Sequence, residues 1–161
     1  MKVYIKNKII TIGGSSTVVD ENGQTVFTVK GKWPSITNKK FLYDKDDKLL
    51  YIIRNKYWRM FNRYALIYDA DKNLIAKVQS KFFSIKKYTI LNHKNEIVIN
   101  GKIFSNSSIV RNGDVIGTYS RRPDMLRDSF ELDAKEEDLP FLTALIIGID
   151  NITDSRTKDR N

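Results

Sequence analysis

Apolar and polar residues alternate along most of the chain, in short runs that turn residues separate. Four of these runs end at positions 20, 44, 69 and 93, so the marked positions step by 24, 25 and 24 residues. Alternation with a period of two is typical of half-buried β-strands. Asp stands at the first three positions, and an Asp side chain stabilises a turn by accepting bonds from the backbone that follows it. A second run comes after each turn, so the pattern predicts a regular series of β-hairpins.

The predicted hairpin arms pair 17–20 with 26–29, 41–44 with 49–53, 66–69 with 74–78, and 90–93 with 96–99. A fifth, shorter hairpin is predicted at 108–117, where Asn112-Gly113 is a strong two-residue turn signal. The N-terminal stretch has lysines spread through it, which excludes a secretory signal and indicates an opening strand. With a closing strand at 129–132, the chain has roughly a dozen strands.

The segment from Leu139 to Ile152 breaks this pattern, because it is apolar on almost every side when drawn as a helix. Glu136 to Asp138 place negative charge before it, and Pro140 suits a first helical turn. Fourteen helical residues span roughly 21 Å, which is short for a bilayer crossing and typical of a buried core helix. The sequence therefore predicts a helix that other elements surround.

A dozen antiparallel strands expose unpaired edges unless the sheet closes on itself. A barrel of more than eight strands leaves a lumen that water, a ligand or a plug must fill. The apolar helix is the natural plug. We therefore predict a mainly β fold, a closed antiparallel barrel around a central helix at 139–152. It forms one domain over 1–152, followed by a flexible tail at 153–161.

The order of these features resembles the LURP-one-related proteins, including their small bacterial members. The matching features are the opening at 4–8, the hairpin turn at 20–23, the basic step Lys30-Gly31-Lys32, the Tyr43-Asp44 turn, the Tyr88 strand and the terminal helix. That family shares its fold with the C-terminal domain of tubby proteins and, more distantly, with phospholipid scramblases. The resemblance implies a twelve-stranded barrel around a C-terminal helix. It also implies phosphoinositide head groups as a ligand class, bound by surface lysines and arginines, without assigning positions in this chain. The cysteines used for lipidation in the scramblase branch are missing here.

The charge balance narrows the range of partners. The chain has 28 Lys and Arg against 19 Asp and Glu, a formal net charge of +9, which favours nucleic acid or a phospholipid surface. A coding bias toward Lys, Asn and Ile would produce the same composition. The sequence has no cysteine, which excludes disulfides, thiolate zinc sites and cysteine nucleophiles and indicates an intracellular protein.

The candidate binding residues are basic side chains that follow the hairpins and stand beside aromatic ones. They are Lys30, Lys32, Lys39, Lys40, Arg54, Lys56, Arg59, Arg63, Lys81, Lys86 and Lys87, with Trp33 and Trp58 as interfacial aromatics. Three further arginines, Arg121, Arg122 and Arg127, stand in a predicted connection around Pro123. Such residues suit an anionic membrane surface, single-stranded nucleic acid, or a solvated rim whose lysine stems cover the ends of the core.

Catalysis has little support in the sequence. His93 is the only histidine and is expected to be exposed in a turn, and no nucleotide-binding, hydrolase or metalloprotease motif is found. The acidic turns at Asp44 and Asp69 lack the pattern of a calcium loop. We expect a non-enzymatic, cytoplasmic binding or scaffold module, peripheral at the membrane, with no metal or cofactor. Acidic phospholipid or phosphoinositide is the leading ligand, while nucleic acid and a protein partner are the alternatives.

Overall fold

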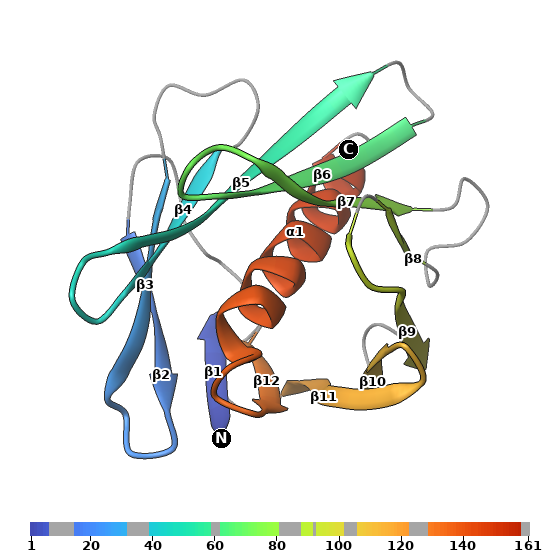
Figure 1. Ribbon diagram of the computed structural model, residues 1–161. Coiled ribbons are helices and arrows are strands. Elements are labelled where there is room, and N and C mark those ends of the chain that lie inside the picture. The colour runs from blue at the N-terminus through green and yellow to red at the C-terminus, as the bar shows by residue number, and fades with distance from the viewer. Residues whose placement is uncertain are drawn as a thin grey trace.

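The computed structural model describes residues 1–6, 15–31, 39–58, 62–80, 88–91, 93–101, 106–122 and 129–158. These residues form twelve β-strands and one helix (Figure 1). The strands are β1 (Lys2–Lys6), β2 (Ser15–Asp20), β3 (Thr25–Gly31), β4 (Lys40–Asp44), β5 (Leu49–Trp58), β6 (Asn62–Asp69), β7 (Leu74–Ser80), β8 (Tyr88–Leu91), β9 (Ile97–Gly101), β10 (Ser107–Arg111), β11 (Asp114–Arg122) and β12 (Ser129–Ala134). The helix is α1 (Leu139–Lys158).

All twelve strands belong to one antiparallel sheet, which curls around α1 in the order β8-β7-β6-β5-β4-β3-β2-β1-β12-β11-β10-β9 (Figure 1). Strand β1 pairs with β2 on one side and with β12 on the other, so the N-terminal strand joins the two halves of the sheet. This arrangement confirms the predicted mainly β barrel with a central C-terminal helix. The barrel is nearly closed, because within the described residues no ladder joins the two edge strands, β8 and β9.

Three hairpins share one turn geometry that begins at an aspartate. The Oδ1 atoms of Asp20, Asp44 and Asp69 accept the backbone N–H four residues further on, at 2.8, 2.9 and 2.8 Å. The residue three positions after each aspartate has a positive φ, at Gly23 (78°), Asp47 (59°) and Lys72 (68°). A bulge shifts the register beside each turn. The bonds that Asn73 donates to Asp69 hold the pKa of that carboxyl below its usual range.

The predicted hairpin at 90–99 is wrong. Strand β8 pairs with β7, and β9 pairs with β10, so the chain crosses here from one edge of the sheet to the other. No aspartate opens this connection. Instead His93 accepts the backbone N–H of Asn95 at Nδ1 (3.1 Å). Asn112 fixes the start of β9, since its N–H donates to the Glu96 carbonyl at 3.0 Å and its Oδ1 accepts the Glu96 N–H at 2.9 Å.

Helix α1 supplies the centre of the hydrophobic core. Its buried side chains point in all directions and include Leu142, Leu145, Ile146, Ile147 and Ile149, each at most 3% exposed. The helix packs against β5, β6 and β7. The helix continues to Lys158, six residues beyond the predicted end at Ile152. Much of the predicted tail is therefore helical, and the last three residues of that tail, 159–161, lie outside the described residues. This stretch contains neither Gly nor Pro, so an established helix extends through it at little cost.

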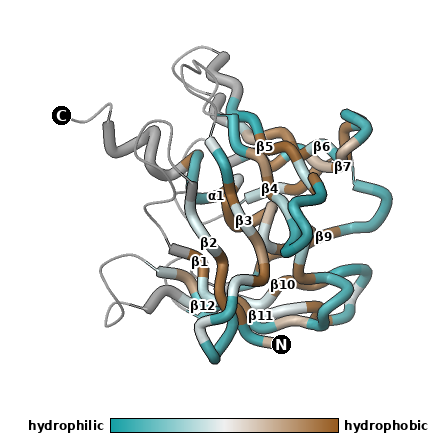
Figure 2. Tube along the Cα trace, turned by 90° about the vertical axis from the view of Figure 1, so that its left-hand side faces the viewer, coloured by the Kyte–Doolittle hydropathy of each residue, from teal (hydrophilic) through white to brown (hydrophobic). Residues whose placement is uncertain are grey.

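The two ends of the barrel differ in whether their polar side chains are exposed or buried. At one end the tight hairpins place hydrophilic residues at their tips, as the teal segments of Figure 2 show. At the other end, polar side chains are buried inside the strand ends and the last turns of the apolar part of α1: Lys40, Asn55, Ser107, Ser129, Asp150 and Asn151. Within the described residues, the side-chain amides of Asn55 and Asn151 have no hydrogen-bond partner.

The burial of Leu145 predicts a large loss of stability on truncation. Leu145→Ala should lower the free energy of unfolding by about 2–5 kcal/mol, because it removes a fully buried side chain and leaves a cavity in the lumen. Urea denaturation followed by circular dichroism measures this loss. Val115→Ala is the matched control, since Val115 is 62% exposed and should change stability by less than about 0.5 kcal/mol. Equal losses in the two variants would contradict a core built on α1.

The buried phenol of Tyr119 predicts a loss of stability at high pH. Burial raises the pKa of Tyr119 to about 12, against 10 for an exposed tyrosine. The folded state therefore holds this proton more strongly than the unfolded state, and the resulting stability is present below pH 10 and lost as the pH rises toward 12. The loss should reach about 3 kcal/mol. Comparing urea denaturation of the native protein and Tyr119→Phe across this range isolates the effect, and parallel curves would contradict it.

Candidate functional site

The structure describes the predicted basic residues to different extents. Side chains are described for Lys30, Lys39, Lys40 and Arg54, while Lys56, Trp58, Arg63, Arg121 and Arg122 are placed by their backbone alone. Lys32, Trp33, Arg59, Lys81, Lys86, Lys87 and Arg127 lie outside the described residues. Arg121 and Arg122 belong to β11, where they pair with Phe130 and Ser129, so the predicted connection begins later than expected.

Strands β3 and β4 carry a group of alternating cations and aromatic rings on the outside of the barrel. Lys30 pairs with Phe41 across the two strands, and the Phe41 and Tyr43 ring centroids are 6.5 Å apart. The Lys30 Nζ lies 4.5 Å from the centroid of the Tyr43 ring, and the Lys39 Nζ lies 4.8 Å from that of Phe41. These distances place both ammonium groups within cation–π range of a ring.

The same surface continues across β5, β6 and β7. Leu66 is flanked by Arg54 on β5 and Lys77 on β7, its cross-strand neighbours. Ile52 is flanked in the same way by Phe41 and Tyr68. Ile52 and Leu66 are 5% and 6% exposed, although both are separate from the core cluster inside the barrel. Arg54 and Lys77, which flank Leu66 on this outer face, have apolar stems of the kind that cover such residues.

Lys77 completes the pattern, because its Nζ lies 4.4 Å from the centroid of the Tyr64 ring. We define the cation–aromatic face as Lys30, Lys39, Phe41, Tyr43, Arg54, Tyr64 and Lys77. Strand parity explains why they meet: Ile53, Ala65 and Val78 face the core, so the residues next to them along each strand face outward.

The cations of this face are neutralised to different degrees. The Lys30 Nζ forms an exposed ion pair with Asp47 at 3.0 Å. The Nε of Arg54 is buried and has no hydrogen-bond partner within the described residues. Lys77 forms no ion pair with another described residue. An anion that reached this face would therefore meet Lys77, whose ammonium group has no ion-pair partner among the described residues.

Lys40 does not belong to this face, because its side chain is only 3% exposed. It has the same strand parity as Leu42, which is fully buried, so it points into the polar end of the barrel. Lys39 and Lys40 are adjacent in sequence and were predicted to act together, yet they belong to opposite sides of the sheet. Successive side chains of a strand point to opposite faces of the sheet, so only one of these two lysines could face outward.

The sequence prediction missed Lys77 and the rings of Phe41, Tyr43 and Tyr64. Phe41, Tyr43 and Lys77 stand within predicted strands and Tyr64 stands two residues before one, whereas the predicted candidates are the basic residues that follow the hairpins. The available signal was alternation: these residues occupy outward positions between core residues such as Leu42 and Ala65.

The described residues meet neither the requirements of a metal site nor those of a membrane-spanning helix. No three of their His, Asp and Glu side chains come together in a way that could hold a metal ion. The helix that the structure describes is not apolar over a long enough stretch to cross a membrane.

Comparison with known proteins identifies the family. Searches of curated proteins and of solved structures give no match. A protein-family model described as LURP-one-related matches residues 1–150. This match covers all the described strands and most of the apolar part of α1. The chain therefore belongs to the LURP-one-related family.

Proposed function

We propose that the chain is a non-enzymatic binding module that attaches to anionic phospholipid surfaces through the cation–aromatic face. The observation that supports this proposal is the repeated pairing of an ammonium group with an aromatic ring on one face, at Lys30 with Tyr43, Lys39 with Phe41, and Lys77 with Tyr64. Acidic phospholipids, including phosphoinositides, present phosphate groups at the depth where aromatic side chains partition.

The energetics favour a membrane surface over a discrete anion site. Each lysine near an anionic leaflet contributes roughly 1 kcal/mol, so three lysines and Arg54 give useful affinity only when all meet the same extended surface. The face spans five strands of a curved sheet, β3 to β7, which suits a broad contact. The ring edges and the stems around Ile52 and Leu66 offer apolar contact at headgroup depth.

The family relation points to the same ligand class. Tubby C-terminal domains, whose fold the LURP-one-related proteins share, bind phosphoinositide head groups through basic residues on the barrel surface. In this chain the corresponding chemistry would come from the cation–aromatic face, together with basic residues such as Lys56, which pairs with Tyr64 across β5 and β6.

The proposal predicts selective binding to anionic vesicles. The chain should co-sediment with phosphatidylcholine vesicles that contain phosphatidylserine or a phosphoinositide, and not with phosphatidylcholine alone. Binding should weaken with added salt, because exposed charges are screened. The double variant Lys39→Gln, Lys77→Gln should bind the anionic vesicles about thirtyfold more weakly, at roughly 1 kcal/mol per lysine.

The matched control is Lys45→Gln, Lys135→Gln, which removes the same charge from two exposed lysines outside the face. This control should lose much less affinity than the face variant. Equal losses would mean that net charge alone drives binding, and equal sedimentation with neutral and anionic vesicles would refute the lipid proposal. A single-stranded oligonucleotide that binds more tightly than the vesicles at the same salt concentration would assign the face to nucleic acid instead.

A further inference from the structure

A second site lies away from the cation–aromatic face, where α1 begins. A solvent-open cleft of about 430 Å³ is bounded by the start of β7, the β8–β9 connection, the end of β10 and the turn that leads into α1. Its volume is within the range of roughly 300–1,000 Å³ that is typical of small-molecule sites. The β8–β9 connection forms one wall of the cleft, where β8 and β9 do not pair with each other within the described residues.

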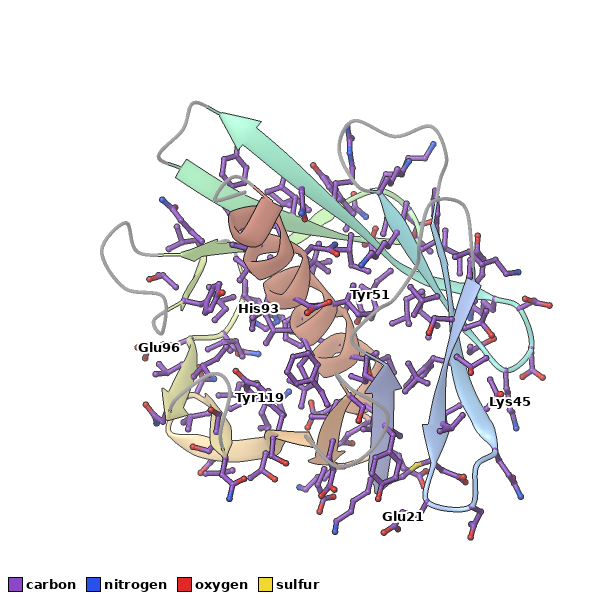
Figure 3. The ribbon with its side chains drawn as sticks, turned by 180° about the vertical axis from the view of Figure 1, so that it is seen from behind. Glu21, Lys45, Tyr51, His93, Glu96 and Tyr119 are labelled. Carbon is purple, nitrogen blue, oxygen red and sulfur yellow. The ribbon has the colours of Figure 1, made fainter. Side chains whose placement is uncertain are left out.

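One side of the cleft is aromatic and apolar. The Phe141 ring is close to two others, with its centroid 4.8 Å from that of His93 and 6.3 Å from that of Tyr51. Tyr51 comes from β5 and His93 from the β8–β9 connection, and both lie beside α1 (Figure 3). Leu74, which is 38% exposed, and Ile75 extend this wall. Burial raises the pKa of Tyr51, and the nearby Asp69 adds to this effect, so the phenol is neutral at physiological pH. Such a wall suits a flat aromatic ring.

The other side of the cleft is charged but balanced. Arg111 donates to both carboxylate oxygens of Asp138, with Nη2 and Oδ2 3.4 Å apart, so these two charges neutralise each other. Lys94 and Glu137 are exposed on different walls and form no hydrogen bond or ion pair with another described side chain. In a chain of net charge +9, the cleft therefore has two cations and two carboxylates. This balance complements a ligand that has both charges and is neutral overall.

Hydrogen bonds between the walls hold the cleft open in the absence of a ligand. The Asn112 side chain donates from Nδ2 to Oδ1 of Asn95 at 3.1 Å, which joins the β10–β11 turn to the β8–β9 connection. The Arg111–Asp138 pair joins β10 to the start of α1. A site whose walls are already fixed loses less entropy when a ligand binds.

We propose that this cleft binds a small aromatic zwitterion, namely a free aromatic α-amino acid or a close analogue. The ring packs against Phe141 and His93. Lys94 binds the ligand's carboxylate, and Glu137 binds its ammonium group. This site is independent of the lipid-binding proposal, because none of its residues belongs to the cation–aromatic face.

Titrations followed by two-dimensional NMR of the ¹⁵N-labelled protein test this site with three probes. L-Tryptophan has both charges, tryptamine has only the ammonium group, and indole-3-acetate has only the carboxylate. L-Tryptophan should shift the backbone amide signals of Lys94, Asn95 and Glu137 in a saturable way. Tryptamine and indole-3-acetate should bind about tenfold more weakly, because each lacks one charge-assisted hydrogen bond.

Two variants separate the roles of the charged residues. Lys94→Ala should weaken L-tryptophan and indole-3-acetate about tenfold and leave tryptamine unchanged, whereas Glu137→Ala should weaken L-tryptophan and tryptamine and leave indole-3-acetate unchanged. Lys45→Ala and Glu21→Ala are the matched controls, since both residues are exposed in hairpin turns and neither lines the cleft (Figure 3). The proposal is overturned by an absence of saturable shifts with L-tryptophan, by equal affinity for all three probes, or by equal effects of the controls.

Discussion

The close fit of α1 inside the curled sheet is the constraint on which the rest of the structure depends. A Cβ atom built at Gly148 would lie 3.3 Å from the Cβ of Ala65, so the helix approaches β6 at two small residues. A Cβ at Gly117 would lie 2.7 Å from Leu142 Cδ1 and 3.2 Å from the Asp133 carbonyl oxygen. The helix is therefore seated against two sides of the barrel. Protein interiors are densely packed, so either glycine could be enlarged only if its neighbours moved.

This fit directs ligand binding to the outside of the barrel. Leu145, Ile146 and Ile147 fill the space in which an open barrel of this size would hold water or a ligand. The outer surface of β3 to β7 and the cleft at the start of α1 are then the places where described side chains of distinctive chemistry gather. They differ in electrostatics: the cation–aromatic face has an excess of positive charge, whereas the cleft has equal numbers of cations and carboxylates.

Turns that depend on hydrogen bonds between nearby residues were predictable from the sequence. The pairing of strands that are distant in sequence was not. The aspartate turns at Asp20, Asp44 and Asp69 formed as expected, because the bonds that stabilise them lie within four residues. The 90–99 segment has the same apolar spacing, yet β9 pairs with β10, and only the tertiary structure decides between two possible partner strands. The position of His93 also depends on the tertiary structure. It was expected to be a solvated turn residue, but its ring packs on Phe141 of α1, almost fifty residues later in the sequence.

Native-state hydrogen exchange tests most directly whether the sheet depends on the helix. If α1 is the centre of a single cooperative core, the backbone amides of Leu142 to Asp150 should open with the same free energy as those of the central parts of β5 and β6, and this value should equal the free energy of global unfolding. Helix amides that exchange through a lower-energy opening, while β5 and β6 remain protected, would contradict this dependence.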